Sequence, residues 1–106
     1  MKNYIIAYIV LNEVKREYGV TSGEISSKTR VANVRRARQV FTQLMREHST
    51  MTLDEIGLLV NRDHSTVSTT SIVVRKELSR DNNYRERYIR VKQNIKNQIE
   101  DGKELC

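Results

Sequence analysis

The stretch TLDEIGLLVNRDHSTV, residues 52–67, decides the fold of this chain. Thr52 and Glu55 have the spacing of a capping box, in which the threonine side chain accepts from a first-turn amide and the glutamate reaches back to the threonine amide. These two residues therefore predict the start of a helix. The helix is short, and its residues predicted to point inward are Leu53, Ile56, Leu59 and Val60.

A second helix is predicted to follow almost at once. Asn61 and Arg62 leave room only for a tight turn, and Asp63 can cap the next helix because its carboxylate accepts from exposed amides at the positive helix end. The inward stripe of this helix is Val67, Ser71, Val74 and Leu78, and the residues off the stripe include His64, Ser65, Ser68 and Thr69. A short helix, a tight turn and a helix that begins with small polar side chains are typical of a helix-turn-helix.

The polar start of the second helix has the residue types that a DNA-reading surface needs. In helix-turn-helix proteins the second helix enters the major groove with its N-terminus first. Serine and threonine can donate or accept there, threonine methyls can touch thymine methyls, and aspartate can accept from cytosine amino groups. The run NRDHSTVSTT, residues 61–70, is consistent with such a surface. Short helix pairs are common, however, and many of them bind no nucleic acid.

The segments before this pair are also predicted to be helical, since the chain has no proline and only four glycines. Residues 3–18 place Ile5, Ile6, Ile9 and Val14 close to one helical face, and Gly19 is a natural stop. A short helix is expected near residues 22–27. A longer helix is expected at about 33–48, with the inward residues Val34, Ala37, Phe41, Leu44 and Met45. Its period places Arg35, Arg38 and Gln39 largely on the other faces.

After the pair, Asp81 can cap a final helix at about 82–100. Its inward residues are Tyr84, Tyr88, Val91, Ile95 and Ile99. The sequence thus predicts an all-α fold of about six helices around a central helix-turn-helix. A single domain is expected over residues 1–106, with its core at 14–78 and no internal repeat.

The net charge of +6 at pH 7 is unevenly distributed along the chain. Between Ile25 and Arg46 there is no acidic residue, and the basic residues are Lys28, Arg30, Arg35, Arg36, Arg38 and Arg46. The segment after Val74 mixes nine basic with six acidic residues and is only mildly basic. A block of one sign within a folded domain indicates contact with a polyanion, most often nucleic acid. The alternative is a solvated helix face that lacks acids.

Cysteine content and hydropathy indicate the cellular compartment in which the protein is expected. The single cysteine, Cys106, rules out a disulfide framework and suits a reducing cytoplasm. The apolar start NYIIAYIVLNEV is too short to span a bilayer and is not followed by a cleavage site of small residues. We therefore expect a cytoplasmic protein without a membrane segment.

Three other function classes can be weighed against DNA binding. Asp63, His64 and Ser65 invite comparison with a catalytic triad, but adjacent residues on a helix diverge, whereas a triad needs its base bonded to both partners. His48, His64 and Cys106 show no metal-ligand spacing, so no metal site is expected. A protein-interaction module is the main rival, since the tyrosines of NNYRERYIRVKQNIKNQIE could pack against a partner helix, although such a stripe is more often core.

The segments YGVTSGEISSKTR, ARQVFTQLMRE, LDEIG and RDHSTV occur in an order and near a spacing that carry a family resemblance. Together they resemble the C-terminal DNA-binding domain of the DnaA replication initiator, over roughly residues 14–74. The resemblance implies an all-helical, Trp repressor-like domain with a helix-turn-helix that binds short DnaA boxes in duplex DNA. It also implies a nucleoid-associated role in replication initiation or its regulation.

The resemblance assigns roles to individual residues. It places Arg30 in the minor groove and Arg38 and Gln39 on backbone phosphate. It also implies that the bases and adjacent phosphates of the major groove are contacted by Asp63, His64, Ser65 and Thr66. The whole predicted DNA-binding set, from resemblance and charge together, is Lys28, Arg30, Arg35, Arg38, Gln39, Arg62, Asp63, His64, Ser65, Thr66 and Thr69. The expected partner is double-stranded DNA, with replication proteins or a second copy as further candidates.

The chain departs from the family at the turn. The family has a Gly-Gly pair before its Arg-Asp-His, whereas here Val60-Asn61 precedes Arg62 with one residue fewer, so we expect an altered turn. No glycine-rich phosphate loop with Lys-Ser/Thr occurs, so neither a nucleotide nor another cofactor is expected. These observations suggest a free-standing box-binding protein or an excised domain. A transcriptional regulator of a phage or mobile element remains an alternative.

Overall fold

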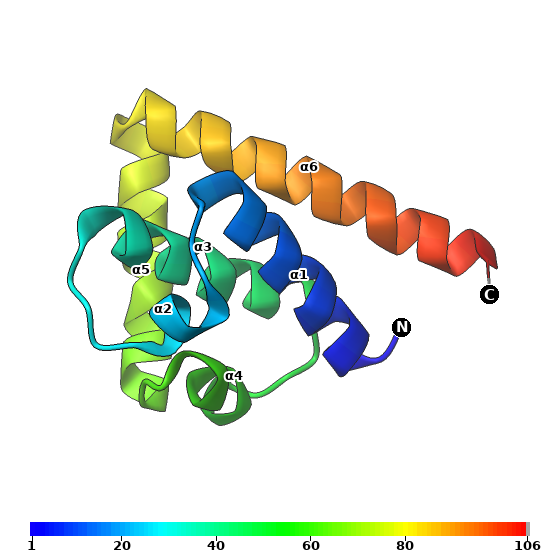
Figure 1. The fold of residues 1–106 in the computed structure, drawn as a ribbon, viewed down its shortest axis with the longest axis horizontal. Helices are drawn as coiled ribbons and strands as arrows, with labels where there is room; N and C mark the ends of the chain where they lie inside the picture. The colour runs from blue at the N-terminus through cyan, green and yellow to red at the C-terminus, as the bar shows by residue number, and fades with distance from the viewer. Residues whose placement is uncertain (106) are drawn as a thin grey trace.

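A computed structural model describes residues 1–105, which fold into six helices and no strand (Figure 1). The helices are α1 (Asn3–Tyr18), α2 (Ser22–Ser26), α3 (Ala32–His48), α4 (Leu53–Val60), α5 (His64–Arg80) and α6 (Asn82–Leu105). The predicted all-α architecture with a central helix-turn-helix, α4 and α5, is confirmed. Cys106 lies outside the described residues, and within them no helix is both long enough and apolar enough to span a bilayer.

Helix α3 is the centre of the molecule and packs against α1, α2, α4 and α5. Helix α6 lies across α1 and α5, and in Figure 1 it occupies the side opposite to α4. Helix α5 runs from α6 at its C-terminal end toward α4 at its start, so the polar beginning of α5 lies far from α6 (Figure 1). This arrangement leaves the turn between α4 and α5 at one end of the molecule.

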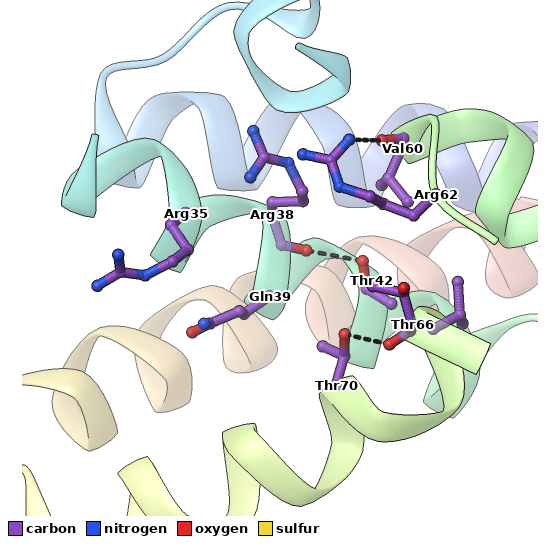
Figure 2. Close-up of a pocket in the computed structure, with 9 residues that line it drawn as sticks. Arg35, Arg38, Gln39, Thr42, Val60, Arg62, Thr66 and Thr70 are labelled. Carbon is purple, nitrogen blue, oxygen red and sulfur yellow. Dashed lines mark hydrogen bonds between the residues drawn. The ribbon is translucent and has the colours of Figure 1, made fainter. Parts of the chain in front are cut away.

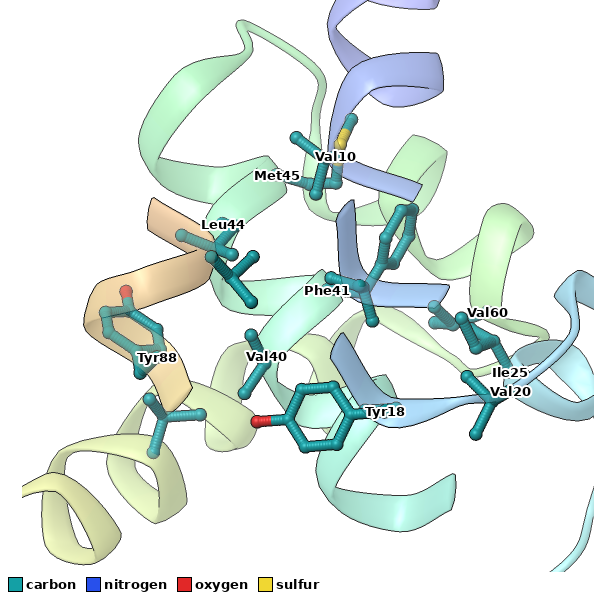
Figure 3. Close-up of a cluster of buried hydrophobic side chains, with 14 of the residues drawn as sticks. Val10, Tyr18, Val20, Ile25, Val40, Phe41, Leu44, Met45, Val60 and Tyr88 are labelled. Atoms are coloured by element: carbon teal, nitrogen blue, oxygen red, sulfur yellow. The ribbon is translucent and has the colours of Figure 1, made fainter. Parts of the chain in front are cut away.

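The core lies around α3, whose predicted inward residues are all buried (Figure 3). Val10 and Val14 of α1 meet this helix and are fully buried. Tyr84 and Tyr88 of α6 retain only 2% and 6% of their exposed surface, while Ile99 is partly buried. The tyrosine stripe is therefore core and is not available to a partner helix. The predicted last helix, about 82–100, extends to Leu105.

Two inward assignments were wrong. Ile5 is 38% exposed, because the buried face of α1 passes through Ile6, Val10 and Val14, and Val10 was not predicted. Leu59 is 40% exposed, because α4 is only two turns long and buries Ile56, Gly57 and Val60 instead. Amphipathic spacing in a helix this short does not separate two neighbouring apolar residues by face.

The caps predicted from the sequence are present at the helix-turn-helix. Thr52 Oγ1 accepts from the Glu55 amide at 3.1 Å, and Glu55 Oε1 accepts from the Thr52 amide at 2.9 Å. Asp63 Oδ1 accepts from the Thr66 amide at 2.8 Å and so begins α5. Between them Asn61 adopts a left-handed conformation with φ 56°, which asparagine tolerates better than most residues. The single asparagine thus closes α4 at the place where the family has a Gly-Gly pair.

Gly57 is required by the tightness of this turn. The Arg62 amide donates to the Gly57 carbonyl at 2.9 Å, and a Cβ at Gly57 would lie 2.3 Å from the Arg62 carbonyl oxygen. Gly57→Ala is therefore expected to lower the free energy of unfolding by about 1–3 kcal/mol, the usual cost of overpacking. Chemical denaturation would measure the loss, with Gly23→Ala as a control because a Cβ there meets nothing closer than 3.8 Å. Equal stabilities of the two variants would contradict this account of the turn.

Candidate nucleic-acid interface

A groove lined by cations lies between the α2–α3 loop, the start of α3, the α4–α5 turn and the start of α5. It consists of two adjoining hollows of about 230 and 340 Å³, which share Arg35, Arg38 and Arg62. The other lining residues are Lys28, Thr29, Arg30, Gln39, Thr42, Val60, Asn61, Thr66, Val67 and Thr70. We call these hollows together the basic groove. Figure 2 shows the hollow of about 230 Å³, where α3 side chains face the turn and the start of α5.

The basic groove has five cationic side chains and no acidic one. Among the described residues, none of these five cations forms a salt bridge with a carboxylate. The basic residues of α6 differ: Arg87 and Arg90 contact Glu17 at 3.3 and 2.6 Å, and Lys92 contacts Glu47 at 2.7 Å. Three cations of α6 are thus paired with acids, whereas those of the basic groove are left uncompensated, so a polyanion would be attracted to the groove.

Arg38 is buried, which corrects its predicted place on an outer face of α3. Its side chain is only 9% exposed, and its Nε donates to the Ile25 carbonyl at 2.6 Å. Its Nη2 donates to three further carbonyls, those of Glu24, Ser27 and Thr29, at 3.2, 3.1 and 3.5 Å. Burial, and to a smaller extent the nearby Arg62, lowers the pKa of Arg38. The guanidinium therefore fixes the end of α2 and the loop that follows it.

Arg62 fixes the same loop from the other side. Its Nη2 donates to the Ser27 carbonyl at 2.9 Å, so one carbonyl accepts from both Arg62 and Arg38. Its Nη1 donates to the carbonyls of Val60 and Asn61 at 3.0 Å each, which holds the α4–α5 turn (Figure 2). The two arginines together tie the α2–α3 loop, the turn and α3 into one surface without any carboxylate.

The other predicted residues of this region remain closer to solvent. Lys28 and Arg30 are exposed on the α2–α3 loop, and Arg35 is exposed on the first turn of α3. Gln39 is half-buried, and its Oε1 accepts from the Tyr84 hydroxyl at 3.1 Å. In Figure 2 the Arg35 side chain points away from the body of the domain, whereas Arg38 points toward α2. Three cations of the basic groove are therefore available to a ligand in a way that Arg38 is not.

The start of α5 presents Asp63, His64, Ser65, Thr66 and Thr69, all of which are exposed. The Asp63 carboxylate is occupied by capping, and the hydrogen bond from the Thr66 amide lowers its pKa. The Thr69 hydroxyl donates back to its own helix, at 3.1 Å from the carbonyl oxygens of Ser65 and Thr66, which leaves its methyl and its lone pairs outward. Of this group only Thr66 also lines the basic groove.

His64 is paired with a residue that sequence reasoning missed. Its Nδ1 lies 3.5 Å from Oδ1 of Asp54, in the first turn of α4. The hydrogen bonds of the neighbouring Asp63 go to the Thr66 amide, so Asp63, His64 and Ser65 do not form the relay that a triad requires. No local signal in the sequence indicates this contact, because Asp54 is ten residues before His64 and at the opposite end of α4 from the turn.

A second polar cluster links α3 to the flank of α5. Arg46 Nη1 donates to Ser71 Oγ at 2.5 Å, and the Ser71 hydroxyl donates to Gln43 Oε1 at 2.6 Å. Ser71 was predicted on the inward stripe and is buried, so this serine satisfies its hydroxyl between two helices. The cluster thus adds a polar contact between α3 and α5.

The residues that form the basic groove and most of the helix-turn-helix match a known protein family. The family model described as bacterial dnaA protein helix-turn-helix covers residues 8–72. Among similar proteins, the chromosomal replication initiator protein DnaA of Herpetosiphon aurantiacus is 42% identical over 59 residues, which are 55% of this chain and 12% of that protein. The corresponding protein of Tropheryma whipplei is 31% identical over 58 residues, with the same coverage.

A third relative extends the similarity toward α6. Chromosomal replication initiator protein DnaA 2 of Protochlamydia amoebophila is 31% identical over 80 residues, which are 76% of this chain. The aligned part is 18% of that relative and 12% of the other two, so the match spans less than a fifth of the length of each of these proteins. The similarity therefore concerns one helix-turn-helix region and not the remainder of the relatives.

Proposed function

Since the chain belongs to the bacterial DnaA helix-turn-helix family, we propose that it binds double-stranded DNA and recognises a short site like a DnaA box. The observation that carries this proposal is the uncompensated basic groove directly beside the exposed polar start of α5. Phosphate contacts from such a groove would set the position of the domain, and the side chains of α5 would select the bases.

The proposal divides the predicted residues by task. Lys28, Arg35 and Gln39 contact backbone phosphates, and Arg30, on the α2–α3 loop that lines the basic groove, enters the minor groove. The bases and the nearest phosphates of the major groove are contacted by Asp63, His64, Ser65, Thr66 and Thr69. Arg38 and Arg62 act from within, because their hydrogen bonds to carbonyls hold the loop that carries Lys28 and Arg30.

The names of the relatives, which are chromosomal replication initiator proteins, support a proposed biological setting. We place the action of this chain in the cytoplasm, on chromosomal or invading DNA, in replication initiation or its regulation. Replication proteins or a second copy of the chain are the further partners that such a role would require. Control of transcription through the same DNA contacts is the second function in view.

Selection of bound duplexes from a random pool, followed by sequencing, tests the proposal directly. A DnaA-box-like motif is expected among the enriched duplexes. Enrichment of an unrelated motif would keep DNA binding and reject the box, while the absence of any enrichment would reject sequence-specific binding. The selection is run at one fixed salt concentration, because phosphate contacts make affinity strongly salt-dependent.

Base reading can be separated from phosphate binding by single substitutions. His64→Ala and Thr66→Ala are each expected to reduce the preference for the enriched site over a scrambled duplex by about 1–3 kcal/mol. Lys28→Ala should weaken both duplexes about equally, because a phosphate contact contains no base information. Paired binding curves at fixed salt measure the difference. If all three variants behave alike, the assignment of residues 63–66 to base reading is wrong.

A further inference from the structure

Asp54 lies where the proposed function brings the protein closest to DNA. It is in the first turn of α4 and is 82% exposed at its side chain, and its Oδ1 is 3.5 Å from Nδ1 of His64, the first residue of α5. If the start of α5 enters the major groove, Asp54 is brought to the same DNA surface. A carboxylate at that place is repelled by the phosphates unless a cation accompanies it.

The other acids at this end of the molecule are already occupied. Glu55 accepts from the Thr52 amide, and Asp63 accepts from the Thr66 amide, so both complete helix caps. The cation that faces the same flank of α5 from α3 is Arg46, whose Nη1 is bound to Ser71 Oγ and lies 3.5 Å from the Ser68 carbonyl, one turn beyond His64. Among the described residues, His64 is the basic side chain within ion-pair distance of Asp54.

We propose that Asp54 is a positioning residue for His64 and that the pair makes DNA binding take up a proton. This inference rests on the proposed DNA binding and adds a pH response to it. With His64 neutral, the protein presents an uncompensated carboxylate to the phosphates. With His64 protonated, the imidazolium neutralises Asp54 and presents its second N–H to a phosphate or a base acceptor.

The contact geometry suits a proton-linked role better than a structural one. A separation of 3.5 Å is too long for a strong hydrogen bond, and an exposed pair contributes little to folding. In a complex with DNA, water is displaced from the pair and a phosphate is added, so the charge on the imidazole matters more. The affinity is then expected to rise as the pH falls through the range in which histidine titrates.

The test compares affinities at pH 8 and pH 6 for a DnaA-box duplex and a scrambled duplex at fixed salt. For the wild type, the affinity should rise about tenfold from pH 8 to pH 6, the change expected when one proton is taken up over about one pH unit. Asp54→Asn should bind severalfold more tightly than the wild type at pH 8 and about equally at pH 6. His64→Gln should lose the pH response on both duplexes, and adding Asp54→Asn to it should raise the affinity at pH 8 above that of His64→Gln alone.

Glu100→Gln is the matched control, because it removes one exposed acid from α6, far from the start of α5. It should keep the tenfold wild-type ratio. His48 is the other histidine; burial lowers its pKa and its Nε2 has no partner among the described residues, so its signal must be separated from that of His64. Nuclear magnetic resonance of the two imidazoles at pH 7 should show protonation of His64 alone when the duplex is added.

The outcomes separate the inference from the proposed function. A wild type that binds duplex DNA while Asp54→Asn keeps the full pH ratio overturns the role of Asp54 and leaves DNA binding standing. Weaker binding of Asp54→Asn at both pH values also overturns it, since Asp54 would then support binding rather than oppose it. Failure of the wild type to bind any duplex overturns the proposed function and this inference together.

Discussion

Arg38→Ala is expected to lower the free energy of unfolding by about 3 kcal/mol, more than any other single change to the basic groove. The Arg38 guanidinium is nearly buried and donates to four backbone carbonyls at the end of α2 and in the α2–α3 loop. Hydrogen bonds to a charged donor contribute about 1.5–3 kcal/mol each, and acceptors left buried without a donor add a penalty. Water entering the space left by the side chain would offset part of this loss.

Chemical denaturation measures this effect, and Arg35→Ala is the matched control. Arg35 lies one turn earlier on α3, is exposed and makes no contact with the loop carbonyls, so its removal should change stability by less than about 0.5 kcal/mol. Arg38→Lys should fall between the two, because one ammonium group cannot replace the planar fork of donors. An Arg38→Ala variant as stable as Arg35→Ala would show that the loop does not depend on this arginine.

The buried position of Arg38 changes how a loss of DNA binding in this variant should be understood. The loop that Arg38 holds carries Lys28 and Arg30, so releasing it would move two exposed cations at once. A binding defect in Arg38→Ala would therefore accompany a stability defect. Arg35→Ala, by contrast, should weaken binding in a fully stable protein.

Helix caps and the buried faces of long helices could be predicted from the sequence. The capping box at Thr52 and the cap at Asp63 depend on residues three positions apart, so their partners are visible in a short window. The inward face of α3 was also predictable, because seventeen residues are long enough for the helical period to define a face. For α4, with eight residues, the same reasoning misplaced Leu59.

Contacts between residues distant in the chain could not be predicted from the sequence. The helical spacing predicted that Arg38 is a surface cation. Its hydrogen bonds, however, are to backbone carbonyls nine to fourteen residues earlier in the chain. Every residue has a backbone carbonyl, so the sequence does not indicate which carbonyls accept from Arg38. The basic residues of α6 were counted as positive charge, but Glu17 of α1 lies between Arg87 and Arg90. The hydrogen bond from Arg90, supported by Arg87, lowers the pKa of Glu17 and keeps this carboxylate charged. The contrast between the paired Arg87, Arg90 and Lys92 of α6 and the uncompensated basic groove therefore emerges only from the fold.

Raising the salt concentration from 50 to 200 mM is expected to weaken duplex binding by about a hundredfold. With Arg38 committed to carbonyls, the cations left to neutralise DNA charge are Lys28, Arg35 and the half-buried Arg36 at phosphates and Arg30 in the minor groove. About four contacts on duplex DNA give a slope of roughly −3.6 in a plot of log affinity against log salt. The same slope should hold for a preferred and a scrambled duplex, because phosphate contacts are shared by all sequences.

Two variants show whether this slope belongs to the basic groove. Arg35→Ala removes one exposed groove cation and should reduce the slope to about −2.7, since each phosphate contact contributes about −0.9. Lys96→Ala removes one exposed cation from α6, the side of the molecule away from α4, and should leave the slope unchanged. The net charge falls by the same amount in both, so only the location of the charge differs. Equal slopes for the two variants would mean that general positive charge, and not the basic groove, attracts the DNA.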